Sequence, residues 1–450
     1  MKNKLLLILL ALMTPLGVFS RFEFSLAASV VLLFVFVASV AGKGFDKNIG
    51  EMACSRFNLS LVFVFGLVAV SLLNPHAVAL RENGYSEIVP QSHIWWLPTS
   101  VSAQVGDRGA FAFLLFWLNV FYFANAVYFC SRERGNSVFF IKAMCVVWIA
   151  AAAYLVYSAA VVYPQVESIG GEKLFGIISS PRASIMGSFF SRNAAAQFFI
   201  VALFCSLGFW LRCLLKNGGG RRSGILPFCA FALSAVALVF CVQAQAMAGL
   251  AVGGIAAVCG LLYVARKRGR RGFGWGILSV LVVGIVLSFA AAAHSDAVSE
   301  LLGDVKEKIA LRTDKGVDFA SDRIAMWKGG VDILSKHRLW GVGANDYVFY
   351  SFTKSGAGTR MAYSVHNDVL QMFVEFGVLG GLALLCLIIC GVFRVLRGTN
   401  RGVFEICFFA GVAVIFAVSL FDMPFRTPNV VWSIFGITAA LLAERKFRSD

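Results

Sequence analysis

Uninterrupted apolar stretches of about 17–23 residues recur along this chain of 450 residues. A helix of that length crosses a hydrocarbon layer of ~30 Å, and backbone in lipid must satisfy its own hydrogen bonds. Only 14% of the residues are charged, whereas soluble domains carry about 25%. We therefore predict an all-α polytopic membrane protein with about 12 transmembrane helices, at residues 4–20, 25–42, 59–75, 109–130, 138–160, 193–215, 225–241, 245–265, 276–294, 367–393, 403–421 and 429–443.

Positive charges orient these spans, because Lys and Arg gather in alternate loops. With a cytoplasmic N-terminus, the cytoplasmic segments hold 22 of the 40 Lys and Arg residues, as the positive-inside rule requires. The C-terminus is then cytoplasmic too. The net charge of +16 reflects this topology, and we expect no nucleic-acid partner. Residues 1–20 either form the first span or are a cleaved signal peptide, and both readings leave the later spans in the same orientation.

We predict a single integral membrane domain over residues 1–450, with no soluble domain at either end. Three outer segments are long enough to carry chemistry, at residues 76–108, 161–192 and 295–366. The longest shows helical periodicity over 296–312 and again over 321–338, where Ser321 is the expected N-cap. The spacing therefore predicts a helical periplasmic cap over residues 295–366, between spans 9 and 10.

The eleven cysteines do not indicate a metal site or disulfide bonds. Ten lie in or at the ends of predicted helices, and Cys54 lies in an inner loop. Neither a CxxC pair nor a Cys/His cluster with metal-ligand spacing occurs. We expect structural thiols and no bound metal.

Two outer segments carry residues suited to the membrane surface. Trp95 and Trp96 stand between two prolines, which is typical of a segment at headgroup level, and we interpret His93 as their solvated neighbour. Arg182 and Arg192 lie near the predicted outer surface. They are suited either to snorkel towards lipid phosphate or to bind an anionic group presented there, because a guanidinium can hold two phosphate oxygens at once.

His366 stands where span 10 begins. Read as one continuous helix, residues 366–382 place Gly377 about 20° from His366 around the axis, and Gly380 about 40° to the other side. This would be a stripe open to another helix or a lipid chain. Glu375 lies on the opposite face, and we expect it to pair with another helix. His366 is either an interfacial histidine bonded to a loop or a functional group.

Residues 323–381 resemble the family of O-antigen ligases, O-antigen polymerases and O-oligosaccharyltransferases. The pattern is an Arg followed four residues later by Trp, a Gly-x-Gly turn, and a His-Asn pair opening a helix that continues Glu-x-Gly-x-x-Gly. Arg182 and Asn193 also stand in places that match the family. The expected long outer loop between spans 9 and 10 agrees with the family's layout. In this chain the main pattern is Arg323, Trp327, Gly341, Gly343, His366, Asn367, Glu375, Gly377 and Gly380.

The resemblance favours the ligase branch. That branch shows His, then Asn, Ser or Gln, nine residues, Gly, two residues and Thr; Gly380 stands in place of the Thr. The polymerase pattern, an Arg separated by ten residues from a Gly, is not met at Arg182, Arg192, Arg312 or Arg323. Many relatives have a Ser-Arg pair in the stretch that reads CVQAQAMAGLAVGG in this chain, which lacks the pair. If that Arg helps to hold phosphate in the relatives, another basic residue must do so in this chain.

The resemblance implies a glycosyltransferase at the periplasmic face of the bacterial inner (cytoplasmic) membrane. Its donor would be an O-antigen-type glycan on polyprenyl (undecaprenyl) diphosphate, and its acceptor would be lipid A–core. Membrane lipids would surround the protein. No metal and no cofactor are expected, because a sugar carbon bonded to diphosphate is already activated. The expected catalytic residues are His366, as base or acceptor-orienting group, and Arg323. Diphosphate contacts are expected from Arg182, Arg192 and Arg312, and support from Asn367, Trp327, Gly377 and Gly380.

Other functions remain open at the level of sequence. A polymerase would extend a second carrier-linked repeat unit, and a protein O-oligosaccharyltransferase would modify Ser or Thr. Among non-enzymes, a twelve-span transporter commonly shows two related halves and charges near the bilayer midplane, whereas this chain has little intramembrane charge beyond Glu375. The glycan, the oligomeric state and the role of His366 as base or positioning group are not readable from the sequence.

Overall fold

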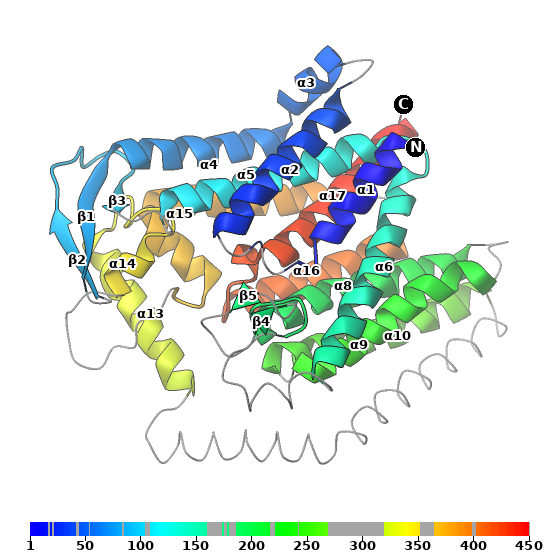
Figure 1. Ribbon diagram of the computed structural model, residues 1–450. Helices are drawn as coiled ribbons and strands as arrows, with labels where there is room; N and C mark the ends of the chain where they lie inside the picture. Colours follow the sequence, from blue (N-terminus) through cyan, green and yellow to red (C-terminus); the bar gives the residue numbers. More distant parts are fainter. Residues whose placement is uncertain are drawn as a thin grey trace.

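The computed structural model describes residues 1–16, 19, 22–41, 45–53, 55–82, 85–103, 109–159, 173–174, 178–179, 186–216, 221–241, 243–268, 319–351, 364–397 and 402–449. Helices dominate this part of the chain (Figure 1). They are α1 Lys2–Met13, α2 Phe22–Val40, α3 Phe45–Ala53, α4 Arg56–Leu73, α5 Ala110–Ser131, α6 Asn136–Tyr157, α8 Arg192–Leu215, α9 Ile225–Cys241, α10 Ala244–Arg268, α13 Phe319–Lys336, α14 Tyr347–Ser351, α15 Asp368–Arg397, α16 Val403–Ser419 and α17 Pro428–Ser449, with 3-10 turns at Arg221–Gly224 and Pro424–Arg426.

The described helices agree with a polytopic membrane protein. Six of them, α2, α5, α6, α8, α10 and α15, are long and apolar enough to cross a membrane, and α4, α9 and α16 are shorter apolar helices. The first predicted span, 4–20, forms a helix of 12 residues, α1. The predicted span 276–294 lies outside the described residues. The count of twelve therefore stays a prediction.

The core of the bundle forms around α8. In its apolar window 78% of the residues are buried, against 28% in α10, so α8 is enclosed by protein while α10 keeps an apolar face for lipid. Helix α16 packs directly against α8. A side chain at Gly208 of α8 would lie 2.8 Å from Cys407 Cβ and 2.9 Å from the Phe404 carbonyl oxygen, so glycine permits this close approach. The contact brings the turn after α16 close to the start of α8.

One end of the bundle carries both termini (Figure 1), and a set of ion pairs lies at the same end. Glu51, at the end of α3, lies 3.2 Å from Arg132 and 2.7 Å from Lys446 of α17. Arg212 of α8 lies 3.1 Å from Glu444 of α17. These segments were all predicted to lie on the cytoplasmic side, and the structure brings them together at one end.

The opposite end contains two small sheets, which the all-α prediction did not include. Strand β1 (Pro75–Glu82) pairs antiparallel with β2 (Tyr85–Pro90) and parallel with β3 (Ser100–Ala103), and β4 (Lys173–Leu174) pairs antiparallel with β5 (Ile178–Ser179). Along β1, Ala77 and Ala79 are buried while Val78 and Leu80 are partly exposed, as in a sheet with one buried face. The described part of the predicted outer segment 76–108 is therefore a sheet with a turn, and the described fold is helical apart from these two sheets.

The turn between β2 and β3 presents Trp95 and Trp96 to the exterior, 73% and 58% exposed. Asn74, which follows α4, holds this turn. Its side-chain amide donates to the carbonyl oxygens of Ile94 (2.9 Å) and Pro98 (3.2 Å), and its oxygen accepts from the Ile94 N–H (2.8 Å). The exposed indoles are thus tied to the end of an apolar helix, which agrees with the position at headgroup level that the sequence predicted.

Helix α13 belongs to the predicted cap over 295–366. It begins at Phe319, so Ser321 lies within the helix, and the prediction that Ser321 caps it is wrong. The predicted helix over 296–312 lies outside the described residues, and the extent of the cap stays a prediction.

Candidate functional site

Arg323 and Trp327 lie on one face of α13, as their spacing of four residues predicts. Nη1 of Arg323 donates a hydrogen bond to the carbonyl oxygen of Phe421, in the turn after α16. The Trp327 ring packs against the Phe421 ring, with their centroids 6.1 Å apart. The helix is therefore anchored on the α16–α17 turn, and Arg323 is brought to the end of the bundle opposite the termini.

His366 adopts a left-handed backbone conformation, with φ of 53°. Its neighbours hold it there. Asn367 caps α15, because its side-chain oxygen accepts from the Leu370 N–H at 2.9 Å, and the N–H of Val365 donates to Gln371 Oε1 at 2.7 Å. A non-glycine residue with positive φ persists only where its surroundings fix it, which often marks a functional site.

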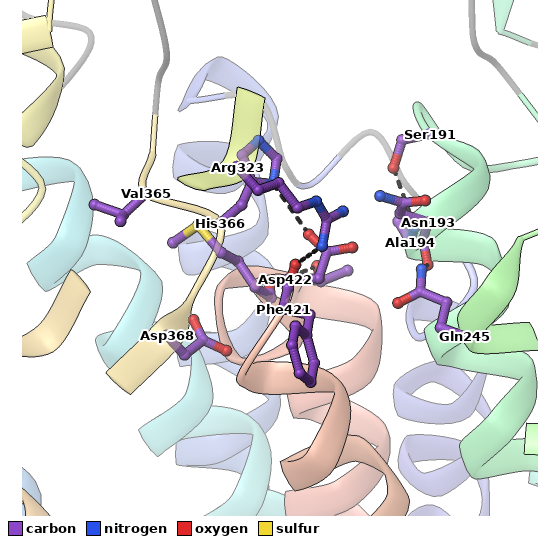
Figure 2. Close-up of polar contacts among 12 residues, drawn as sticks. Ser191, Asn193, Ala194, Gln245, Arg323, Val365, His366, Asp368, Phe421 and Asp422 are labelled. Atoms are coloured by element: carbon purple, nitrogen blue, oxygen red, sulfur yellow. Dashed lines mark hydrogen bonds and ion pairs between the residues drawn. The ribbon is translucent and has the colours of Figure 1, made fainter. Parts of the chain in front are cut away.

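Asp422 is the partner of His366. Nδ1 of His366 lies 3.2 Å from Asp422 Oδ1, and the two side chains are 39% and 9% exposed. Gln197 of α8 donates from Nε2 to the second oxygen, Oδ2, at 3.1 Å. Figure 2 shows Arg323 and His366 converging on the turn that carries Phe421 and Asp422. A carboxylate that accepts from Nδ1–H leaves Nε2 as the lone-pair nitrogen, so this ring can accept a proton at Nε2.

Sequence reasoning missed Asp422 and Gln197. Asp422 is the only acidic residue between the predicted spans 403–421 and 429–443. A carboxylate placed directly after an apolar span was therefore the signal that could have found it. Gln197 carries no such signal, because a single Gln inside an apolar helix is compatible with many structural roles.

Glu375 pairs with Arg426. The Glu375 side chain is fully buried, and its Oε2 accepts from Nη2 of Arg426 in the turn before α17. Its Oε1 accepts from Gln371 Nε2 at 2.6 Å. The prediction was that Glu375 pairs with another helix; its partner, Arg426, instead ends the short 3-10 turn Pro424–Arg426 between α16 and α17.

Residues 366–382 are not one continuous helix, which corrects the predicted glycine stripe. Gly377 interrupts α15 with φ of 66°, because the chain following α13 inserts there. The N–H of Val342 donates to the Val374 carbonyl (3.0 Å), and the N–H of Val378 donates to the Arg338 carbonyl (2.8 Å). A side chain at Gly377 would meet the backbone of Leu339 and Trp340. The gap left by the glycine is filled by this loop, and a Cβ at Gly380 would meet Phe376 of the same helix.

Of the three arginines predicted to bind diphosphate, only Arg192 lies within the described residues. Arg182 and Arg312 lie outside the described residues. Arg192 is the first residue of α8, five positions before Gln197, and Ser191 caps this helix by accepting from the Ala194 N–H at 3.1 Å (Figure 2). The diphosphate-binding role of Arg192 stays a prediction.

Gln245, within the stretch that lacks the Ser-Arg pair, lies next to α8. Its Nε2 donates to the Asn193 carbonyl oxygen at 3.3 Å, and Gln197 Nε2 lies 3.5 Å from its Oε1. The residues around 245 therefore reach the site, but with a neutral amide. Within the described residues, no three His, Cys, Asp or Glu side chains are grouped to hold a metal ion, and metal independence stays a prediction.

A second polar cluster lies at the sheet, outside the membrane-spanning helices. His76 of β1 is buried, and its Nε2 lies 2.6 Å from the Tyr350 hydroxyl of α14. The His337 ring lies 5.1 Å from the His76 ring, and that of His93 lies 5.9 Å from it. Burial, helped by these two neighbours, lowers the pKa of His76 to about 4, and burial also lowers the pKa of His337. The His76 and His337 imidazoles are therefore neutral at pH 7, and they hold the sheet to α14 and to the end of α13.

A comparison with protein families shows that residues 229–385 match the family model Wzy_C, described as O-antigen ligase. The match spans roughly a third of the chain, includes Arg323 and His366, and ends before Asp422. No curated protein matches the chain. The match supports glycan-transferase activity of the O-antigen ligase or polymerase type, and residues 229–385 are similar to the O-antigen ligase family.

Proposed function

We propose that this protein transfers an O-antigen-type glycan from a polyprenyl diphosphate carrier to lipid A–core, at the periplasmic face of the bacterial inner membrane. One observation carries the proposal. Arg323, from the segment after span 9, and the His366–Asp422 pair meet at a single turn of the chain, at the end of the bundle opposite the termini (Figure 1). A cation for the leaving group and a base for the acceptor are thus supplied side by side.

These residues serve the bond-breaking and bond-forming step as follows. The acceptor hydroxyl oxygen attacks the sugar carbon C1, the bond from C1 to the diphosphate oxygen breaks, and its electron pair leaves with the diphosphate. Arg323 offsets the charge that develops on the departing oxygen, and Arg192 is suited to assist from the start of α8. Direct attack of this kind inverts the configuration at C1.

The proton of the acceptor hydroxyl passes to Nε2 of His366. Asp422 holds the ring with Nδ1 protonated and stabilises the imidazolium that forms, while Gln197 holds the second carboxylate oxygen. General-base assistance of this type accelerates reactions by roughly 10²–10⁴-fold. The exposed fraction of His366 leaves room for an acceptor to approach it.

Both substrates are lipid-anchored under this proposal, so they diffuse in the bilayer and meet at its surface. The N- and C-termini lie on the cytoplasmic side, as the distribution of Lys and Arg indicates. The exposed turn at Trp95 and Trp96 then lies at the periplasmic headgroups.

One observation keeps a polymerase as the second candidate. Gly380 stands where the ligase pattern has Thr, and the same catalytic groups would serve an acceptor that is a second carrier-linked repeat unit. The two activities differ only in the acceptor, which the experiment below separates.

The test is transfer by the purified protein in lipid nanodiscs. Polyprenyl-diphosphate-linked glycan is supplied with lipid A–core or without it, and the His366→Ala variant is compared with His93→Ala, an exposed histidine of the sheet region. Glycan on lipid A–core, lost in His366→Ala and kept in His93→Ala, is the expected result. Longer carrier-linked chains without added core would show a polymerase. Absence of product with several donors would contradict the proposed function.

A further inference from the structure

The two members of the His366–Asp422 pair lie on separate segments that a buried ion pair joins. His366 precedes α15, and Asp422 lies in the turn between α16 and α17. Glu375, nine residues after His366, pairs with Arg426, four residues after Asp422. The fully buried carboxylate requires its partner, because an unpaired charge in such surroundings is very unfavourable. The ion pair therefore sets the position of one segment relative to the other.

Gln371 extends this ion pair to the backbone beside His366. Its Nε2 donates to Glu375 Oε1 at 2.6 Å, and its Oε1 accepts from the Val365 N–H at 2.7 Å. Gln371 is buried, so neither hydrogen bond is easily replaced by water. Both polar atoms of one amide are thus used to connect a buried carboxylate to the peptide unit that enters the left-handed residue His366.

Arg426 also donates a hydrogen bond from Nη1 to Asn345 Oδ1, at 3.1 Å. Asn345, with φ of 61°, and His366 are the two non-glycine residues with positive φ in the described part of the chain. The same ion pair is therefore linked to both residues whose backbone conformation must be fixed from outside.

We propose that Gln371 is a positioning residue, which together with the Glu375–Arg426 ion pair holds the His366 backbone so that Nδ1 faces Asp422. Gln371 touches neither substrate in this scheme. Its effect on transfer rests on the proposed function, whereas its effect on the orientation of the His366 ring does not.

The test uses Gln371→Met, which keeps the length of the side chain and removes both hydrogen bonds. Gln91→Met, at an exposed glutamine, is the matched control for the substitution. Arg426→Gln is compared with Arg212→Gln, which breaks another partly exposed arginine–glutamate pair at the opposite end of the bundle. Melting temperatures of all four variants establish that each is folded.

The first readout is nitrogen NMR of the histidine rings in the full-length protein, at alkaline pH where imidazole is neutral. His366→Gln assigns the signal. The proton of wild-type His366 is expected on Nδ1, where Asp422 accepts it. In Gln371→Met the signal should move towards a mixture of tautomers, as in Asp422→Asn, while Gln91→Met keeps the wild-type signal. A wild-type signal in a folded Gln371→Met protein would overturn the proposal.

The second readout is a kinetic double-mutant cycle. Gln371→Met should lower kcat by roughly 10- to 100-fold, the cost of a misplaced catalytic group, with KM for the donor within about twofold. Combining it with Asp422→Asn should give little further loss, because both changes act through one ring. If the losses of kcat in the two single variants multiply in the double variant, Gln371 acts independently of the His366–Asp422 pair and has a structural role. If the wild-type protein transfers no glycan, the proposed function fails, and the NMR comparison still decides the positioning role.

Discussion

His366 faces a carboxylate that is almost buried, and this pairing determines what the ring can do. Because Asp422 Oδ1 accepts from Nδ1, the other nitrogen is free to receive a proton from an acceptor hydroxyl. Arg323 reaches the same turn from α13 through the Phe421 carbonyl. At the scale of single residues, the candidate site is one turn of chain with a base and a cation on either side.

Replacing Asp422 by Asn should lower kcat by roughly 10²–10⁴-fold with little change in KM. Asparagine keeps the shape but lacks the charge that stabilises an imidazolium. Its side-chain NH2, which cannot accept a hydrogen bond, can also face Nδ1. Steady-state transfer kinetics check this, with Asp332→Asn, an exposed carboxylate of α13, as the control. An unchanged kcat in Asp422→Asn would contradict a base oriented by this carboxylate.

Replacing Arg323 by Lys should raise KM for the donor by about tenfold, because an ammonium is a point charge and cannot hold two phosphate oxygens in one plane. The charge is kept, so the change tests geometry rather than electrostatics alone. Arg338→Lys, at an exposed position two residues after α13, is the matched control. Equal donor KM values for the two variants would remove Arg323 from the diphosphate site.

At the scale of elements, the decisive feature is the interruption of α15 at Gly377. The loop that follows α13 pairs its backbone with Val374 and Glu375 on one side of the break and with Val378 and Leu379 on the other. This pairing ties α13 to α15, so the helix that carries Arg323 and the helix that begins beside His366 move together.

Gly377→Ala should lower the free energy of unfolding by about 1–3 kcal/mol, because φ of 66° disfavours alanine and its Cβ would meet the Leu339 backbone. Gly329→Ala in α13 is the matched control. No atom lies within 4 Å of a Cβ there, so helix propensity should raise stability by up to about 1 kcal/mol. Thermal unfolding in detergent measures both. A Gly377→Ala protein as stable as wild type would show that the break tolerates a side chain.

At the scale of the whole molecule, the end opposite the termini is joined by a histidine cluster. His76 on β1 and His337 after α13 meet Tyr350 of α14, and the His93 ring lies beside that of His76. The sheet next to α4 is thereby connected to the cap helix of the candidate site, and this connection depends on neutral His76 and His337.

Acid should loosen this connection. The pKa of His76 is lowered from 6.5 to about 4 by burial and by the neighbouring His337 and His93, so between these values the unfolded chain binds a proton that the folded chain excludes. Stability from this group is therefore complete above about pH 6.5 and falls by on the order of 2–3 kcal/mol as pH drops towards 4.

Thermal unfolding at about pH 7 and pH 5 checks this expectation. His76→Asn should be less stable than wild type at pH 7, because it loses the contact with Tyr350, and should lose less stability on acidification. His93→Asn, at an exposed position, should keep most of the acid effect. The same acid loss in His76→Asn as in wild type would assign the effect to other groups.

Much of the architecture could be predicted because it depends on local composition. Eleven of the twelve predicted spans fall on described helices, and the face shared by Arg323 and Trp327 follows from helical spacing. The sheet over β1–β3 could not be predicted in this way, because its strands are short and lie in a segment whose tryptophans indicated a membrane surface. The break at Gly377 was missed because glycine inside an apolar run is equally compatible with a straight packed helix.

The sequence alone predicts a chain that crosses a membrane, the loops that share a side, and an arginine and a histidine near the ends of particular helices. Apolar length and charge distribution act locally, so they can be read without a fold. That Asp422 faces His366 across 56 residues, and that Arg426 pairs with Glu375 across 51, is visible only in the folded chain. Such pairs depend on how α8, α15 and α16 pack against one another, and no spacing along the chain contains that information.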